Sequence, residues 1–312
     1  MLYDVIIIGG GPGGFTAALY CARACFKVLL LEKLTPGGQM GTTDVVDNYP
    51  GFHAGIGGFE LSMQMKQGAE RFGAETKLAA VKEVDLKSKI KTVTTSKEIF
   101  CGKTVILATG AYPAELGLSR ERELRGRGIS YCATCDGMFY RGKTAAVVGG
   151  GNTAVADLLY LSKICKEVFL IHRRDKLRAS AVYTKPLADC KNVTFFYDSE
   201  VKDITGGDKL KGIQVYDRKM DTTREIAVDG LFIAVGNLPE TFLYKDQLRL
   251  DEKGYIPSDE TTKTELPGVF AVGDLRAKPL RQIVTAASDG AVASHFVEEY
   301  LIEAGDFGEA DE

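Results

Sequence analysis

The clearest pattern along the chain is one arrangement of apolar and small residues that occurs twice. Residues 3–32 read "YDVIIIGGGPGGFTAALYCARACFKVLLLE", and residues 143–174 read "KTAAVVGGGNTAVADLLYLSKICKEVFLIHRR". In both, an apolar run leads into a cluster of glycines, then into a stretch rich in small residues, and then into a second apolar run. Apolar runs joined by a glycine turn and a helix are typical of a βαβ unit. The chain is therefore predicted to contain two such units.

Three further apolar runs complete the predicted architecture. Residues 103–113 and 228–240 each follow one βαβ unit and end in a small-residue turn with a proline. A third run, residues 266–276, has no glycine-rich unit of its own to complete, so we expect it to return to the first sheet. The prediction is an α/β fold with two Rossmann-like, three-layer domains built on parallel sheets, the second domain being inserted into the first.

The expected domain boundaries follow from this insertion. The first domain should comprise residues 1–112 and 243–312, and the inserted domain residues 113–242. The chain crosses from one domain to the other twice, and both crossings contain glycine and proline. The acidic tail, residues 306–312, has little to bury, and we expect it to fray.

The first glycine turn has the spacing of a dinucleotide-binding fingerprint. Gly9 permits the tight turn, Gly11 lets the backbone approach a pyrophosphate, and Gly14 allows the helix to pack closely on the sheet. The helix N-terminus then offers N–H groups and partial positive charge to the phosphates. Glu32 ends the second apolar run, where a carboxylate accepts hydrogen bonds from a ribose diol and repels a 2′-phosphate. The first unit is therefore expected to hold a non-phosphorylated dinucleotide such as FAD.

The second unit repeats the turn but ends differently. Arginines follow its second apolar run in "LIHRRDKLRAS". Arginine forms charge-assisted, bidentate hydrogen bonds with phosphate, so this unit is predicted to bind NADPH through the 2′-phosphate; the alternative is a solvated basic loop. The residues assigned to this site are Gly149, Gly151, Asn152, Thr153, Ala154, His172, Arg173, Arg174 and Arg178.

Composition excludes some functions. The 312 residues are 45% hydrophobic and 26% charged, as in ordinary soluble domains. The net charge of -3 gives no reason to expect nucleic acid as a partner. No apolar run is long enough to span a membrane, and the start lacks the basic region of a signal peptide, so we expect a cytoplasmic protein with no membrane partner.

Two of the seven cysteines stand out by their context. These two are Cys132 and Cys135, which occur as C-x-x-C in "YCATCDGMFY". Cys21 and Cys25, by contrast, lie on a predicted helix and are expected to share one packed face. A zinc site usually needs a second pair of ligands, and no metal is expected. A structural disulfide with so short a loop would remove little chain entropy and is not expected in a reducing compartment. A redox-active pair fits best, because C-x-x-C spacing lowers thiol pKa values and makes disulfide formation reversible.

Together these motifs resemble the low-molecular-weight thioredoxin reductases, flavoproteins with two dinucleotide-binding domains. The resemblance covers nearly the whole chain through "GGGPGG", "GGQM", "DNYPG", "ATG", "CATCDG", "GGGNTAV", "HRRDKLRA", "AVGNLPET", "GVFAVGD" and "RQI". The chain departs from the family pattern at three positions. Ala156 stands where many relatives have Glu, and Met40 and Ile283 replace the commoner Leu and Ala. The change at Ala156 bears on hydrogen bonding in the NADPH site.

The resemblance implies further contacts with FAD. Asp274 would hydrogen-bond the ribityl chain, and backbone N–H groups of residues 281–283 would stabilise negative charge on reduced flavin. Asn48 and Gln39 have structural alternatives, as a turn residue and as a solvated loop residue. The residues assigned beyond the glycine turn are Gly38, Gln39, Asn48, Thr109, Gly110, Gly273, Asp274, Arg281, Gln282 and Ile283.

The resemblance also implies a route for electrons. NADPH would reduce FAD, and FAD would then reduce the Cys132–Cys135 disulfide, with Cys135 facing the flavin. Cys132 would attack the disulfide of thioredoxin, and Asp136 would protonate the leaving thiolate, although "CDG" is also a common turn. The inserted domain is expected to rotate between the two half-reactions, and the chain is expected to form a homodimer.

Other functions stay open at the level of the sequence. A thioredoxin reductase fed by ferredoxin should lack the pyridine-nucleotide signature, which this chain keeps. A different acceptor, such as a peroxiredoxin or another small dithiol protein, would be selected by surface loops. A non-catalytic flavoprotein or a zinc-stabilised binding module would not need an intact set of nucleotide and thiol motifs.

Overall fold

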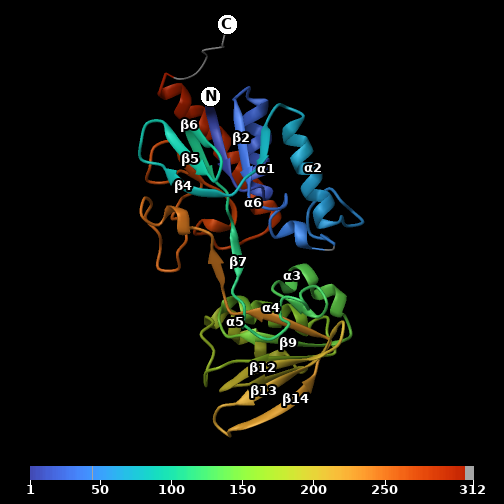
Figure 1. Ribbon diagram of the computed structural model, residues 1–312. Helices are drawn as coiled ribbons and strands as arrows, with labels where there is room; N and C mark the ends of the chain where they lie inside the picture. The colour runs from blue at the N-terminus through green and yellow to red at the C-terminus, as the bar shows by residue number, and fades with distance from the viewer. Residues whose placement is uncertain (44, 306–312) are drawn as a thin grey trace. The chain divides into compact units, whose positions relative to one another are not determined.

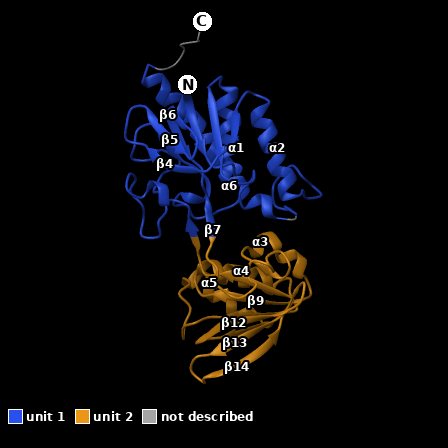
Figure 2. Cartoon of the chain, in the orientation of Figure 1, with its two compact units in different colours: residues 1–112, 238–312 blue, residues 113–237 orange. Residues whose placement is uncertain are grey.

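The chain folds into two compact units, which are described separately. The computed structural model describes residues 1–43 and 45–305, and the tail expected to fray lies outside them. One unit comprises residues 1–112 and 238–312, and the other comprises residues 113–237 (Figure 2). The second crossing thus lies at 237/238 instead of 242/243. The chain rejoins the first unit at once, because the N–H of Glu240 donates to the carbonyl of Gly110.

A seven-stranded sheet forms the centre of the first unit. Its order is β3-β2-β1-β6-β5-β4, and β17 also pairs with β6 (Figure 1). The third apolar run therefore returns to the first sheet, as predicted, in parallel with β6. The strands are β1 (Leu2–Ile8), β2 (Val28–Glu32), β3 (Glu75–Leu78), β4 (Val81–Asp85), β5 (Lys91–Thr95), β6 (Ile99–Leu107) and β17 (Val269–Ala271). The helices are α1 (Pro12–Arg23), α2 (Gly58–Glu70) and α6 (Ile283–Glu303), with short 3₁₀ helices η1 (Met40–Thr42), η4 (Phe242–Tyr244) and η5 (Gly273–Leu275).

Alternation along β1 builds a core on both faces of this sheet. Val5 and Ile7 pack in one cluster with Phe15 of α1 and with residues of α6. Ile6 and Ile8 point to the opposite face and pack in a second cluster. Because both faces are buried, the strand reads as one continuous apolar run, which is why the sequence indicates it clearly.

Helix α1 ends earlier than the sequence suggests, so the prediction that Cys21 and Cys25 share one helix face is wrong. The helix ends at Arg23, and Cys25 is exposed with a left-handed φ of 63°. The N–H of Phe26 donates back to the carbonyl of Cys21, a pattern that commonly closes a helix. Cys21 is buried, and burial raises the pKa of its thiol to about 12.

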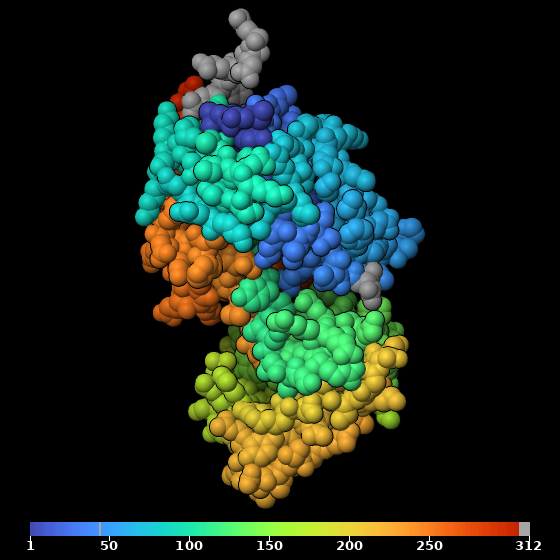
Figure 3. Space-filling view, in the orientation of Figure 1, coloured from blue at the N-terminus to red at the C-terminus, as the bar shows by residue number. Residues whose placement is uncertain are grey.

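The second unit has three layers. A parallel sheet, β11-β10-β9-β15-β8, lies between α4 on one face and the antiparallel sheet β12-β13-β14 on the other (Figure 1). Residues 114–128, green in Figure 3, lie largely on the surface of this unit, and Leu124 packs from this segment into the core between the sheets. The strands are β8 (Ile129–Ser130), β9 (Thr144–Gly149), β10 (Glu167–Ile171), β11 (Val193–Phe196), β12 (Ser199–Gly206), β13 (Leu210–Asp217), β14 (Thr222–Ala227) and β15 (Gly230–Ala234). The helices are α3 (Ala133–Asp136), α4 (Asn152–Ser162) and α5 (Ala181–Thr184), with 3₁₀ helices η2 (Gly137–Tyr140) and η3 (Lys185–Asp189).

Two short strands carry the chain between the units. Strand β7 (Ala111–Pro113) pairs with β16 (Asn237–Pro239) in a two-stranded sheet of their own. Each strand ends in a proline, which fixes one backbone angle and cannot donate to a longer ladder. The crossing is therefore a short paired ribbon.

Candidate active site

The C-x-x-C segment lies in the second unit and packs on helix α4. Cys132 and Cys135 form a disulfide with 5.3 Å between their Cα atoms, and both residues are half-buried. The N–H of Asp136 donates to the carbonyl of Cys132 over 3.1 Å, which closes the single turn of α3. Gly137 then lies so close to α4 that a Cβ there would be 2.6 Å from the ring of Tyr160. Cysteines joined as a disulfide cannot serve as two thiolate ligands of zinc, so this arrangement favours the redox interpretation.

The carboxylate of Asp136 is held inside the same turn. The hydroxyl of Ser130 lies 2.6 Å from Oδ2 of Asp136, and the N–H of Cys132 donates to that hydroxyl over 3.1 Å. Asp136 thus shapes the turn and also places an acidic group beside the cysteine pair. The sequence interpretation did not include Ser130. A serine two residues before the cysteine is, however, a known signal for a hydroxyl that bonds the backbone locally.

A second carboxyl group, Asp157 on α4, lies beneath the same helical turn. Asp157 is buried and accepts a hydrogen bond from the N–H of Ala133. Burial raises the pKa of the Asp157 carboxyl to about 7, although the hydrogen bond from Ala133 acts in the opposite direction. Its neighbour Ala156, where many relatives carry Glu, is half-buried on the same helix. Asp157 was missed as a site residue, although a charge among the apolar residues of this helix face is a visible signal.

The first glycine turn has the close contacts that its spacing predicts. Gly9 has a φ of 111°, and a Cβ there would collide with the carbonyl of Ala108. A Cβ on Gly14 would collide with the carbonyl of Gly9, so the helix can approach the strand only if residue 14 is glycine. At Gly11, by contrast, a Cβ would meet no atom within 4 Å. The backbone at the start of α1 is therefore accessible, as the approach of a pyrophosphate requires.

Glu32 ends β2 with its carboxylate turned toward this glycine turn. Its Oε2 accepts the N–H of Gly10 over 2.7 Å, and its Oε1 accepts the N–H of Leu34 over 2.9 Å. The two oxygens of a carboxylate offer about four acceptor positions, so these bonds leave capacity for a ribose diol. Glu32 therefore stabilises the turn and can also bind a nucleotide.

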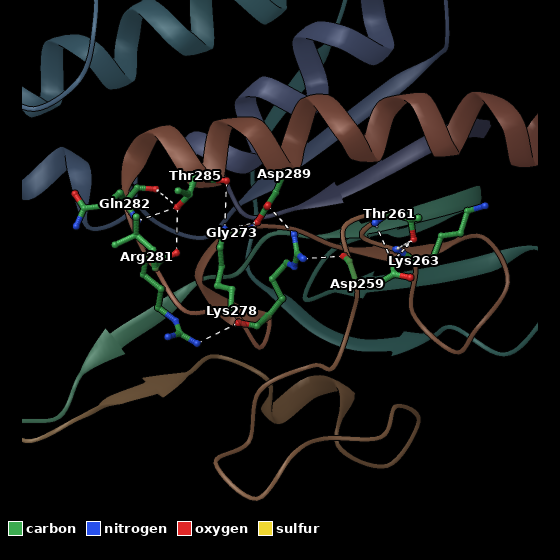
Figure 4. A network of polar contacts seen from close by, with 11 residues as sticks. Asp259, Thr261, Lys263, Gly273, Lys278, Arg281, Gln282, Thr285 and Asp289 are labelled. Atoms are coloured by element: carbon green, nitrogen blue, oxygen red, sulfur yellow. Dashed lines mark hydrogen bonds and ion pairs between the residues drawn. The ribbon is translucent and has the colours of Figure 1, made fainter. Parts of the chain in front are cut away.

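At the same edge of the first sheet as the glycine turn, a buried ionic network fixes the Gly273–Asp274 turn to α6. Figure 4 shows Asp289 of α6 pointing toward Gly273, whose N–H donates to Oδ2 over 2.8 Å. Arg276 and Lys278 each donate to the Asp289 carboxylate over 2.6 Å. All three charged side chains of the network are nearly inaccessible. The sequence interpretation did not include this network, because its members are brought together only by tertiary packing.

Asp274 fits a ligand that carries hydroxyl groups. Its Oδ1 is buried and has no hydrogen-bond partner within the described part of the chain. Burial raises the pKa of this carboxyl, while the positive charges of Lys278 and Arg281 act to lower it. A buried polar atom without a partner is costly, so Asp274 is suited to receive a hydrogen bond from a polyol chain such as ribityl.

Residues 281–283 lead into α6, which begins at Ile283 with Gln282 as its N-cap. Gln282 and Thr285 form a capping box, in which the side chain of each bonds the backbone of the other. The Oε1 of Gln282 also accepts a hydrogen bond from Nδ2 of Asn48 over 3.1 Å. The guanidinium of Arg281 lies over the ring of Tyr255 at 4.0 Å and donates to the carbonyls of Asp274 and Arg276. The structure therefore brings Asn48 next to this segment across a long stretch of sequence.

Ile283 packs against a small apolar cluster that contains Met40. The two apolar positions at which the chain departs from the family pattern thus belong to one packing unit. A change of side-chain volume at one position can be accommodated by a change at the other.

Three of the residues assigned near the flavin form hydrogen bonds with residues beside the two crossings between the units. The side-chain amide of Gln39 donates to the carbonyl of Ala111. The hydroxyl of Thr109 donates to the carbonyl of Glu240 over 2.7 Å, and the carbonyl of Gly110 accepts the N–H of Glu240. Gly38, next to Gln39, is exposed. Gln39, Thr109 and Gly110 therefore have a structural role where the chain leaves and re-enters the first unit.

The second glycine turn repeats the first in its tight and open positions. Gly149 has a φ of 153°, and a Cβ there would lie 2.6 Å from the Cβ of Ala154 on α4. A Cβ on Gly151 would meet no atom within 4 Å. The ring of His172 packs so closely on Gly150 that no Cβ fits between them, and burial lowers the pKa of this imidazole. The structure thus places His172 beneath the turn, as support for it.

The loop after β10 folds back over the second turn. The N–H of Arg178 donates to the carbonyl of Gly150 over 2.7 Å, and the side chain of Asn152 accepts the N–H of Ser180 over 2.8 Å. Thr153 is exposed at the start of α4. Arg173, Arg174 and Arg178 are also exposed, and within the described residues none forms an ion pair with an acidic side chain. The loop therefore presents positive charge beside an accessible glycine turn, which suits a phosphorylated ribose.

Two dinucleotide-type units, with a disulfide held in the second, define a class of nucleotide-dependent disulfide oxidoreductases. Within the described residues, no helix is long and apolar enough to cross a membrane, and no group of three or more His, Cys, Asp or Glu side chains is arranged to hold a metal ion. The model of the family described as pyridine nucleotide-disulphide oxidoreductase matches residues 3–290.

Comparison with known proteins narrows this class. The chain is 44% identical to a thioredoxin reductase of Listeria monocytogenes, over 99% of this chain and 97% of that protein. It is 48% identical to a thioredoxin reductase of Streptomyces clavuligerus, over 96% and 94% of the two chains. The crystal structure of thioredoxin reductase from Streptococcus pyogenes superimposes with a TM-score of 0.89 at 42% identity, covering 97% of this chain and 99% of that one. The chain belongs to the pyridine nucleotide-disulphide oxidoreductase family and, within it, to the thioredoxin reductases. The resemblance and the fold class inferred from the sequence are thereby confirmed.

Proposed function

We propose that this chain transfers reducing equivalents from NADPH, through FAD and the Cys132–Cys135 disulfide, to oxidised thioredoxin. The observation that carries the proposal is the placement of that disulfide, in the same unit as the second glycine turn and packed on the helix that follows this turn. In the balanced reaction, NADPH, one proton and oxidised thioredoxin give NADP⁺ and dithiol thioredoxin. FAD, when bound, supplies the two-electron relay between the nicotinamide and the disulfide.

The cysteine pair carries out the thiol–disulfide exchange. The Cys132 thiolate attacks one sulfur of the thioredoxin disulfide, a mixed disulfide forms, and the other thioredoxin sulfur leaves as a thiolate. Asp136 gives its proton to that thiolate. The Cys135 thiolate then attacks the sulfur of Cys132, which releases the second thioredoxin sulfur and restores the disulfide. The similarity to the thioredoxin reductases supports the order of the two cysteines, and the hydrogen bonds within one helical turn support the role of Asp136.

The two glycine turns divide the cofactors between the units. FAD binds the first unit, with its pyrophosphate at Gly11, its adenosine ribose at Glu32 and its ribityl chain at Asp274. The open backbone at Gly11 and the unpaired buried oxygen of Asp274 support this assignment. NADPH binds the second unit at Gly151, with its 2′-phosphate among the exposed arginines of the following loop. The accessible turn and the absence of ion pairs to those arginines in the described structure support this assignment.

Three properties complete the proposal. The nicotinamide and the cysteine pair both belong to the second unit and both need the flavin, so that unit rotates on the β7–β16 ribbon between the half-reactions. The protein acts as a homodimer in the cytoplasm. A cross-link that fixes one orientation of the units should stop turnover while one half-reaction continues, and unchanged steady-state turnover would overturn the rotation.

A steady-state assay tests the proposed function. With NADPH, the protein should reduce thioredoxin in an assay coupled to the reduction of insulin. The Cys132→Ser variant should lose this thioredoxin reduction, while NADPH should still bleach its flavin. Reduction of thioredoxin by reduced ferredoxin, with no bleaching by NADPH, would favour the ferredoxin-dependent alternative. Reduction of a peroxiredoxin in preference to thioredoxin would redirect the proposal to another acceptor.

A further inference from the structure

Ser130 has no role in the reaction proposed above, although it lies beside the cysteine pair. It ends β8, it pairs with Phe232 of β15 in the sheet, and only 3% of its surface is accessible. Its hydroxyl oxygen lies 2.6 Å from Oδ2 of Asp136, 3.1 Å from the amide nitrogen of Cys132 and 3.3 Å from the carbonyl oxygen of Cys132. One buried hydroxyl on a rigid strand therefore contacts both the proposed acid and the backbone of the proposed attacking cysteine.

The hydroxyl can satisfy Asp136 in either protonation state. Its oxygen accepts the N–H of Cys132 in both states. When Asp136 is ionised, the single hydroxyl proton is donated to Oδ2, since a bond to a charged acceptor is the stronger one. When Asp136 is protonated on Oδ2, the carboxyl donates to the serine oxygen, and the hydroxyl proton turns to the carbonyl of Cys132. A hydroxyl in this position therefore keeps the carboxyl hydrogen-bonded whether it carries its proton or has given it away.

We propose that Ser130 is a positioning residue for the acid–base step, holding Oδ2 of Asp136 beside the backbone of Cys132 in both protonation states. The inference rests on the proposed function, in which Asp136 protonates the leaving thiolate. Ser130 does not itself contact the thioredoxin sulfur. Its effect is transmitted through the orientation and the proton affinity of Asp136, because a donor to the ionised carboxylate lowers the pKa of that carboxyl.

Other titratable groups near α3 have to be separated from Asp136. Besides β8, the helices η2 and α4 pack against this turn and contribute Tyr140, Asp157 and Tyr160 beside the cysteine pair itself. Burial raises the pKa of Tyr140 to about 12, and the charges of Asp136 and Asp229 act in the same direction, so Tyr140 stays protonated over the working range. Burial raises the pKa of Asp157 to about 7, so this carboxyl can contribute a limb of its own to the pH profile. A limb in the pH profile that persists in Asp157→Asn and disappears in Asp136→Asn belongs to Asp136.

The test is the pH dependence of thioredoxin reduction by the full-length holoenzyme and its variants. Ser130→Ala should lower kcat about tenfold and move the Asp136 limb upward by about one pH unit. Ser130→Thr, which keeps the hydroxyl, should restore both. In the Asp136→Asn background, Ser130→Ala should add less than a twofold loss, because a residue that acts through Asp136 has nothing left to act on.

Three outcomes distinguish the possibilities. An unshifted Asp136 limb in Ser130→Ala, or equal losses in the presence and absence of Asp136, would overturn the inference. The rate at which NADPH bleaches the flavin serves as the folding check, and if Ser130→Ala fails it, Ser130→Cys provides the same comparison, because a thiol has a similar shape and is only a weak hydrogen-bond donor. A wild-type enzyme that does not reduce thioredoxin at all would instead contradict the proposed function, whatever the variants do.

Discussion

Replacing Asp157 with Asn should stabilise the second unit, and the gain should depend on pH. Asp157 is buried under the C-x-x-C turn, where burial raises the pKa of its carboxyl from 3.8 to about 7. A carboxyl group with a raised pKa in the folded state binds its proton more tightly when folded. Stability therefore falls as pH rises from the unfolded to the folded pKa, and it stays at the lower level above that. Asn keeps an oxygen that can accept the N–H of Ala133 and carries no charge.

The size of the gain follows from the two pKa values. A shift of about three pH units corresponds to a free energy of about 4 kcal/mol, at 1.36 kcal/mol for each unit. The variant and the wild type should therefore have nearly the same stability below about pH 3, where Asp157 is protonated in both the folded and the unfolded state. The difference should open between about pH 4 and pH 7 and remain constant at higher pH.

Hydrogen exchange under increasing urea is the suitable assay, because it reports the unfolding free energy of the second unit separately from the first. Strands β9 and β10 of this unit supply the protected amides. Asp189→Asn is the matched control, since Asp189 is exposed on η3 of the same unit. Parallel stability curves for wild type and Asp157→Asn across this pH range would refute the account of a buried, ionisable Asp157.

Further predictions concern the two cofactor sites. Gly14→Ala should destabilise the first unit by about 1–3 kcal/mol in urea unfolding, because its Cβ would collide with the carbonyl of Gly9. Gly11→Ala, which has room for its Cβ within the protein, should unfold like the wild type and yet weaken FAD binding about tenfold in fluorescence titrations of the apoprotein; unchanged affinity would contradict a pyrophosphate at this turn. Asp289→Asn should cost about 3–5 kcal/mol in urea unfolding and speed FAD release, because it removes the carboxylate that two buried cations contact; a loss below about 1 kcal/mol would show that the network is not coupled to stability. Arg178→Ala should raise KM for NADPH about tenfold and leave KM for NADH unchanged, and equal effects on both coenzymes would favour a solvated basic loop.

The repeated units could be predicted because their information is local. The run around Ile7 is continuous because both faces of the sheet are buried. Gly9 and Gly14 can be recognised from their spacing alone, since the collisions that exclude other residues arise within one turn. The insertion of the second unit could also be inferred, because the third apolar run had only the first sheet to join.

The residues that sequence reasoning missed depend on tertiary packing. Asp289 lies far along the chain from Gly273, and nothing in its own segment indicates that it bonds the Gly273 N–H. The position of Asp157 on an apolar helix face is visible in the sequence, but its partner, the N–H of Ala133 in the C-x-x-C turn, is not. The helix boundary before Cys25 was missed because a cysteine is a rare residue in the left-handed conformation that ends α1. Local patterns therefore indicate turns and strands, while the partners of buried charges require the folded structure.

The most direct test of the central claim is an anaerobic titration of the wild-type holoenzyme with NADPH, in which flavin absorbance and protein thiols are measured together. The account predicts that NADPH bleaches the flavin, that two new thiols appear for each chain as Cys132 and Cys135 are released from their disulfide, and that adding oxidised thioredoxin consumes both. NADH should be markedly less effective than NADPH. Bleaching without new thiols, or thiols that oxidised thioredoxin leaves unchanged, would contradict the route of electrons proposed for this protein.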